Sequence, residues 1–167
     1  SDYIGINIKK RPVDLKTYRA ERRIQTTRDR MRSTLSGLRF RLARSLVPWL
    51  AKSCMTISNW ESTTSRSDGT PPNEIVFRRR AIAEIDFKFA FGEFVQTTAP
   101  KGTSHNDLTD RTEACIALIP DINNSGWWFL KLDSWEVIHR SAGTAQPLTP
   151  IIIALLNERA DKEAEQR

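Results

Sequence analysis

The sequence predicts an α+β fold that has a long basic amphipathic N-terminal helix, a mainly antiparallel β-sheet of four or five strands, and a C-terminal helix. Three observations predict it. Residues 14–46 carry apolar side chains at helical spacing and no proline. Alternating or aromatic-rich runs between residues 74 and 139 are separated by polar turn segments, as in antiparallel sheets. Thr149 and Pro150 then precede an Ile- and Leu-rich run, with the residue types of a helix start.

The N-terminal helix is expected to begin after Pro12, with Asp14 as its cap, and to continue through Gly37 to about Leu46, where Pro48 stops it. At about 100° per residue, its apolar and basic side chains separate onto opposite faces. The apolar stripe comprises Ile24, Met31, Leu35, Leu38, Leu42 and Leu46. The basic face comprises Arg19, Arg22, Arg23, Arg30, Arg41 and Arg44.

The β-rich body is expected to open with a short strand from Cys54 to Trp60, followed by a polar loop over 61–73. Residues 74–96 predict a long strand, because apolar residues between Ile85 and Phe91 alternate with Asp86, Lys88 and Ala90. This run exceeds a usual strand, so a bend is expected near residues 79–81 or at Gly92.

Residues 114–119 predict the next strand. The segment 120–126 has turn chemistry, and the aromatic-rich run from Trp127 to His139 completes a hairpin. The C-terminal helix ends in a charged tail over 157–167. The chain therefore divides into a basic helical N-terminal segment, residues 1–52, and a β-rich body with the C-terminal helix, residues 53–167.

Charge is distributed unevenly between these two parts. Residues 1–52 hold 14 basic residues against four acidic ones, a net charge of +10. Residues 53–167 hold 12 basic residues against 16 acidic ones, a net charge of −4, and the whole chain is +6. A basic segment beside an acidic body is typical of contact with nucleic acid or an anionic membrane.

Arginine outnumbers lysine ten to four in residues 1–52, and a guanidinium grips phosphate with two hydrogen bonds and stacks on bases. The basic helix face is therefore predicted to bind a polyanion, with RNA favoured over DNA. Three alternatives remain open: a solvated surface helix, a helix lying on an anionic membrane, and an organelle-targeting segment.

Two further groups are candidates for the same interface. Arg78, Arg79 and Arg80 begin the predicted long strand, where they either extend the basic surface or protect a strand edge from aggregation. Trp127 and Trp128 are neighbours in a strand, so one of them is expected to point away from the core and to stack on a base or anchor an interface.

Catalysis has little support in the sequence, and no cofactor, metal or small-molecule substrate is expected. The one cluster suited to a metal or a general base is Ser104–Asp107 with Asp110, which contains His105. Cys115 and His139 would form a thiol pair only if the fold brought them together, and Cys115 lies in a predicted buried strand.

Cys54 and Cys115 lack metal-ligand or disulfide-framework spacing, which predicts buried thiols in a reducing intracellular compartment such as the cytoplasm, an organelle interior or a virion. The longest apolar run, residues 151–156, is too short to span a bilayer, and residues 1–10 do not have the pattern of a secretory signal.

These observations predict a non-enzymatic RNA-binding structural protein, either a ribonucleoprotein subunit or a viral coat or RNA-binding accessory protein. A basic N-terminal segment before a β-rich body resembles viral coat proteins in organisation, although coat-protein arms are typically featureless and this segment is patterned as a helix. Self-association is expected, because the apolar stripe and residues 151–156 need partners. The alternative function is a protein-interaction or membrane-peripheral assembly subunit.

Overall fold

The computed structural model describes residues 18–61, 68–98 and 112–166, and it confirms the predicted α+β fold. Helix α1 (Tyr18–Gly37) leads through the short 3-10 helix η1 (Arg44–Leu46) into α2 (Val47–Trp60). Two short helices follow, α3 (Pro72–Phe77) and α4 (Ala83–Asp86). The chain ends in five strands and a last helix, α5 (Pro150–Glu165).

The sheet contains β1 (Phe94–Thr98), β2 (Thr112–Pro120), β3 (Trp127–Lys131), β4 (Val137–Arg140) and β5 (Gly143–Ala145), in the order β4-β3-β2-β1-β5. All neighbouring strands are antiparallel. The predicted strand at 114–119, the turn after it and the pairing of this strand with the start of the Trp127–His139 run are confirmed, but the run forms two strands, β3 and β4, instead of one. The predicted C-terminal helix is also confirmed, and Thr149 caps it by accepting a hydrogen bond from the Ile152 amide.

The order of the strands requires the sheet to be strongly curled. Strands β4 and β5 are consecutive and lie at opposite edges, yet only two residues separate Arg140 from Gly143. Three residue steps reach about 10 Å at most, whereas the edges of a flat five-stranded sheet lie about 19 Å apart. The two edges therefore approach each other, and the sheet has an inner and an outer face.

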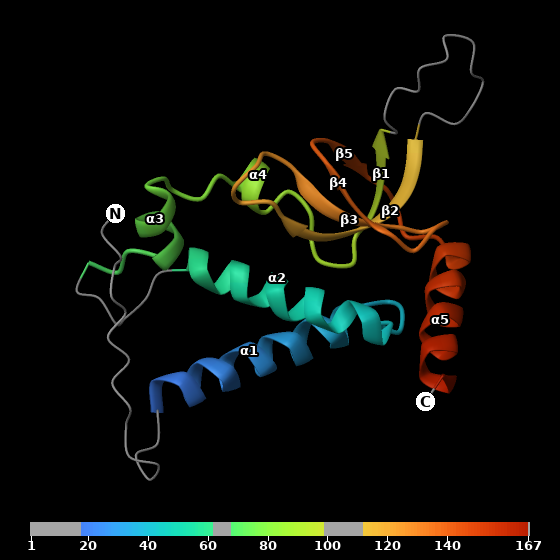
Figure 1. The fold of residues 1–167 in the computed structure, drawn as a ribbon, viewed down its shortest axis with the longest axis horizontal. Coiled ribbons are helices and arrows are strands. Elements are labelled where there is room, and N and C mark those ends of the chain that lie inside the picture. The colour runs from blue at the N-terminus through green and yellow to red at the C-terminus, as the bar shows by residue number, and fades with distance from the viewer. Residues whose placement is uncertain (1–17, 62–67, 99–111, 167) are drawn as a thin grey trace, which may run out of the picture.

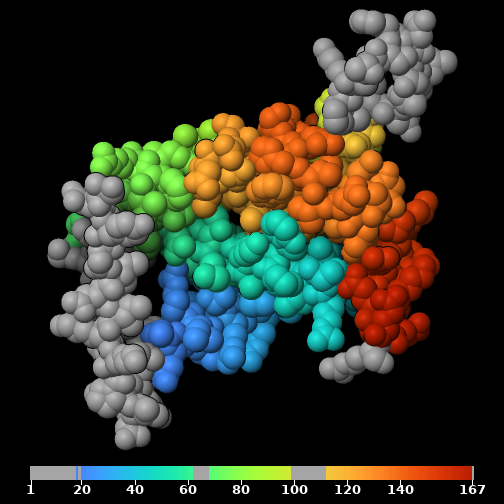
Figure 2. Space-filling view, viewed as in Figure 1, coloured from blue at the N-terminus to red at the C-terminus, as the bar shows by residue number. Residues whose placement is uncertain are grey.

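Both faces are covered. The inner cluster contains Phe89, Val95, Cys115, Ala117, Trp127 and Phe129. The outer cluster joins strand residues such as Ile116 and Leu130 to Phe40, Leu46 and Leu156 from the helices and their connections. Figure 1 shows α2 between α1 and the sheet, with α5 at the right-hand end of the fold. Figure 2 shows α1 and α2 as adjacent layers below the sheet.

The predicted end of the N-terminal helix and the strand predicted after it are wrong. The N-terminal helix ends at Gly37 instead of continuing to Leu46, and the chain turns so that Phe40 and Ala43 enter the core. Pro48 lies in the first turn of α2, where proline is well tolerated, so it begins a helix rather than stopping one. The expected strand from Cys54 to Trp60 belongs to this helix, and the boundary predicted after residue 52 falls inside it.

The long strand predicted over 74–96 is also wrong, because it is divided among α3, α4 and the start of β1. Ile85 and Phe87 are exposed, whereas Asp86 between them is buried, which reverses the expected alternation. The burial of a paired carboxylate overrides the local pattern here. Among the described residues, no helix is long and apolar enough to cross a membrane.

Candidate nucleic-acid interface

The basic face predicted for a single long helix is divided between two structural contexts. Arg22, Arg23 and Arg30 belong to α1, whereas Arg41 and Arg44 lie beyond Gly37, in the connection to α2. Arg19 is also in α1, but its side chain lies outside the described part of the structure. The six arginines predicted to share a face therefore do not form one helical row.

Helix α1 packs in a different orientation from the one predicted, with Thr27, Arg30, Met31 and Thr34 on its less exposed side. Arg23 donates a hydrogen bond to Asn59 Oδ1 at 2.5 Å, and Arg30 forms a two-pronged ion pair with Glu61, with Nη1 at 2.7 Å from Oε1. The hydrogen bond from Arg30 to Glu61 raises the pKa of the Arg30 guanidinium above its usual value. Two of the predicted ligand-binding arginines therefore help to attach α1 to the end of α2.

The apolar stripe of α1 is correspondingly left in part on the surface. Ile24 and Leu35 are exposed, whereas Thr27 and Thr34 are half-buried on the side that holds Arg30. The surface that α2 offers includes the polar groups of Cys54 and Asn59, which explains why polar side chains face it. Burial raises the pKa of the Cys54 thiol and outweighs the opposing hydrogen bond with Thr34.

Four exposed arginines of α1 and of the connection after it have no ion pair or side-chain hydrogen bond within the described ranges: Arg22, Arg28, Arg39 and Arg44. The first two project from α1, and the last two lie in and after the turn that follows it. Arg32 is also exposed and pairs only with Asp29, one turn away on the same helix, an interaction of small net value in water. We call Arg22, Arg28, Arg32, Arg39 and Arg44 the basic surface.

The connection that carries Arg39 and Arg44 is fixed by α5. The Arg41 amide donates to Asn157 Oδ1 at 2.7 Å, and the Arg41 guanidinium contacts Asp161 at 2.6 Å. Arg41 is therefore neutralised by α5 and is not a free cation. Phe40 and Ala43 are buried beside it, which anchors the same stretch in the core.

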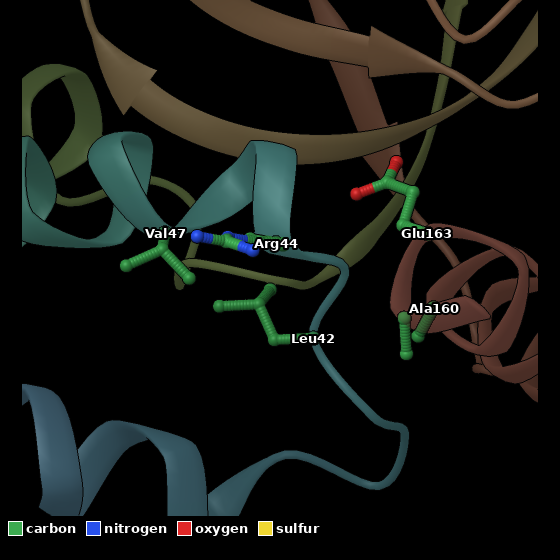
Figure 3. A pocket seen from close by; sticks show the side chains of 6 residues that line it. Leu42, Arg44, Val47, Ala160 and Glu163 are labelled. Atoms are coloured by element: carbon green, nitrogen blue, oxygen red, sulfur yellow. The ribbon is translucent and has the colours of Figure 1, made fainter. Parts of the chain in front are cut away.

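A hollow of about 520 Å³ lies between this connection and α5. It is lined by Leu42, Arg44, Val47, Ala160, Glu163 and Ala164. Figure 3 shows Arg44 on one side of it and Glu163 on the other. The Glu163 carboxylate accepts two hydrogen bonds from Ser45, each 2.9 Å long, and pairs with Arg159. Burial opposes the ionisation of Glu163, but these partners outweigh burial and lower the pKa of the carboxyl. Glu163 is therefore paired with Ser45 and Arg159, and it does not pair with Arg44.

The three consecutive arginines occupy a turn between α3 and α4, not the start of a strand. Arg78 is exposed in a left-handed conformation with φ of 51°. Arg79 binds the buried Asp86 through both nitrogens, and its guanidinium lies 4.9 Å from the centre of the Trp60 ring. Arg80 is exposed, and its single ion pair in the described structure is a long one, with Nε 3.5 Å from Glu74 Oε1. Arg78 and Arg80 therefore face solvent, and Arg79 has a structural role.

The expected free tryptophan is absent from the hairpin, because the curled sheet is covered on both faces. Trp127 is 5% exposed, packs edge-on against Phe89 and donates from Nε1 to the Ile85 carbonyl at 3.0 Å. Trp128 is half-buried between Trp49 and His139. Trp127 is therefore a core residue, and both neighbours of Trp128 in these contacts are aromatic side chains of the same chain.

The catalytic candidates are not assembled by the described part of the fold. Cys115 is fully buried against Thr97, which lies 3.5 Å away, and burial raises its pKa. His139 instead contacts Asp121 at 3.4 Å, so the thiol pair predicted as an alternative is not formed. The cluster around His105, with Asp107 and Asp110, lies outside the described residues.

Sequence reasoning missed the acids that remove Arg30 and Arg41 from the basic surface. Glu61 and Asp161 are 31 and 120 residues away along the chain, so no local pattern relates them to their partners. A signal for the broken helix was present in Gly37, which has the weakest helix propensity apart from proline. Comparisons of the chain with protein-family models, curated proteins and solved structures find no match.

Proposed function

We propose that this chain is a non-enzymatic structural protein that binds nucleic acid, RNA in preference to DNA, through the basic surface. One observation carries the proposal: four exposed arginines, Arg22, Arg28, Arg39 and Arg44, have no acidic partner in the described structure. An isolated exposed cation gains little from the fold, whereas several on one segment suit a polyanion. The predicted reducing compartment agrees with this role, since Cys54 and Cys115 are free, buried thiols.

The chemistry of the basic surface supports a phosphate ligand. Each guanidinium presents a planar set of donors that matches two phosphate oxygens, and it remains charged at every relevant pH. RNA is favoured because guanidinium planes also stack on the splayed bases of single-stranded loops. Helix α1 and the Phe40–Ala43 anchor hold these arginines on ordered backbone, which lowers the conformational entropy lost on binding.

The test is charge reversal at two arginines whose side chains form no ion pair in the described structure. The Arg22→Glu/Arg28→Glu variant changes the net charge by −4, and the Lys52→Glu/Lys88→Glu control changes it equally at exposed positions that lie outside the basic surface and form no ion pair in the described structure. Arg30 and Arg41 are unsuitable for this test, because reversing either would place a carboxylate against Glu61 or Asp161.

Binding to labelled single-stranded RNA is measured across a series of salt concentrations. Each lost phosphate contact lowers the slope of log affinity against log salt by about 0.7 for a single strand. We expect the arginine variant to lose affinity and slope, and the control to resemble the wild type. Equal behaviour of the two variants would contradict the basic surface as the binding site.

A second candidate function is a peripheral assembly subunit on an anionic membrane, which the exposed apolar residues of α1 favour. Ile24 and Leu35 are exposed next to Arg28 and Arg32 on the helix, the arrangement of a helix that lies in a lipid interface. Vesicles with and without phosphatidylserine distinguish the two functions. Binding to these vesicles that requires Ile24 and Leu35, without RNA affinity, would replace the first proposal with this one.

A further inference from the structure

The segment from Ile75 to Phe87 exposes an unusual concentration of large apolar side chains. Val76 is 70% exposed, and the other four lie between 42% and 47%: Ile75, Ile82, Ile85 and Phe87. Single exposed apolar residues are ordinary on a protein surface, whereas a contiguous apolar patch is typical of an interaction site. We call these five residues the α3–α4 surface.

The backbone beneath this surface is held from three directions. Arg79 and the buried Asp86 close the segment on itself through two hydrogen bonds of 2.7 Å. The Trp60 ring packs against the Arg79 guanidinium, and Trp127 donates a hydrogen bond to the Ile85 carbonyl. The segment is therefore well packed, and poor packing is not the reason why its apolar side chains are exposed. They project from a pre-formed scaffold, which lowers the cost of binding a partner.

Helix α5 has an apolar face of its own in solvent. Ile151 is 78% exposed and Leu155, one turn later, is 39% exposed. Glu158, Lys162 and Glu165 follow at helical spacing on the same side, and Lys162 pairs with Glu158 at 2.6 Å. The opposite side of α5 is occupied, since Leu156 is buried in the outer cluster with Ile152 and Ile153 against it.

The two surfaces differ in the sign of their charge. Once the ion pairs within the described structure are set aside, α5 keeps one unpaired acid, Glu165, whereas residues 74–88 keep two unpaired bases, Arg78 and Lys88, and one unpaired acid, Glu84. A contact of the α3–α4 surface with its own copy would bring Arg78 and Arg80 near their equivalents, which like-charge repulsion disfavours. The charges instead match the α3–α4 surface to α5.

These surfaces lie toward opposite ends of the molecule. In Figure 1, where the longest axis is horizontal, α3 and α5 are at the two sides of the fold, so α5 cannot reach the α3–α4 surface of its own chain. We propose that α5 of one copy docks on the α3–α4 surface of a second copy, head to tail. Such a contact leaves one surface free at each end, so it extends into a ring or a linear assembly. This inference is independent of RNA binding.

The test uses the complete chain, treated with nuclease and purified in high salt so that RNA cannot bridge copies. The surface variant is Val76→Asp/Ile82→Asp, and the helix variant is Ile151→Asp/Leu155→Gln. Light scattering over a concentration series is expected to show assembly of the wild type, and each variant alone is expected to remain monomeric. An equimolar mixture is expected to form a dimer, because the intact α5 of the surface variant fits the intact α3–α4 surface of the helix variant.

Met55→Asp is the control, since Met55 is 50% exposed on α2, outside both surfaces, and this variant should assemble like the wild type. The milder Val76→Ser should weaken association by about tenfold, the loss for one buried apolar side chain, and it guards against misfolding of the Asp variants. A monomeric wild type would overturn the proposal. So would a monomeric mixture, or a control as defective as the two variants.

Discussion

Arg79 holds Asp86 with both arms of its guanidinium: Nη1 lies 2.7 Å from Oδ2, and Nη2 lies 2.7 Å from Oδ1. The carboxylate is 1% exposed and also accepts a hydrogen bond from the Ile82 amide at 2.9 Å. A buried charge is tolerated only when its oxygens are satisfied in this way. The pair fixes the turn between α3 and α4, and it explains why the predicted strand does not form there.

Removing the partner should therefore be costly. We expect Arg79→Met to lower the free energy of unfolding by about 3 kcal/mol, the lower end for an unpaired buried charge, because Arg79 is partly exposed. Urea titration followed by circular dichroism measures the change. Arg78→Met is the control and should stay within about 0.5 kcal/mol of the wild type, since Arg78 has no partner in the described structure. Equal losses in both variants would contradict the role of the pair.

The same pair predicts a dependence of stability on pH. Burial opposes the ionisation of Asp86, but Arg79 and the Ile82 amide outweigh it and hold the pKa of Asp86 below its usual value. A lowered folded pKa stabilises the protein above the unfolded pKa of about 3.9, and this contribution is lost as the pH falls through the folded pKa. The advantage of the wild type over Arg79→Met should therefore shrink as the pH falls, first as the unpaired buried Asp86 of the variant takes up a proton, and then as the pH passes through the lowered pKa of Asp86 in the wild type. An advantage that is constant down to pH 2 would refute this assignment.

Gly92 should not tolerate a side chain. Its φ is +85°, and a Cβ there would lie 2.6 Å from Leu38 Cδ2 and 3.3 Å from Phe40 Cζ. Gly92→Ala adds backbone strain to this contact and should cost about 1–3 kcal/mol, measured by thermal and urea unfolding. Gly37→Ala is the matched control, because nothing lies within 4 Å of its added Cβ and alanine favours a helix. We expect Gly37→Ala to be neutral or stabilising, and the reverse order of the two variants would contradict the close approach.

Two leucines of the predicted apolar stripe should differ strongly in their effect on stability. Leu46 is 3% exposed in the outer cluster, so Leu46→Ala should cost about 2–5 kcal/mol. Leu35 is 41% exposed, and Leu35→Ala should cost less than about 1 kcal/mol. The midpoint of urea unfolding distinguishes them. Similar losses of unfolding free energy in the two variants would instead support the single buried apolar stripe that the sequence predicted.

Local patterns predicted the C-terminal half of the fold well. The Thr149–Pro150 start of α5 and the turn before Trp127 depend on neighbouring residues, and the Asp121 carboxylate accepts hydrogen bonds from the Asn123 and Asn124 amides within that turn. The N-terminal half was predicted less well. Whether the chain continues as helix after Gly37 is decided by the burial of Phe40 and Ala43 against the sheet, a contact that helical spacing does not contain.

The sequence by itself determined the α+β class, the basic N-terminal segment and the number of arginines in it, because these depend on composition and short-range pattern. Only the tertiary structure decided which arginines are free. Arg30 and Arg41 are neutralised by Glu61 and Asp161, and Arg79 by Asp86. Arg22, Arg28, Arg39 and Arg44 meet no acid in the described structure. A charge is cancelled by its neighbour in space, and two of these three acids are far away along the chain.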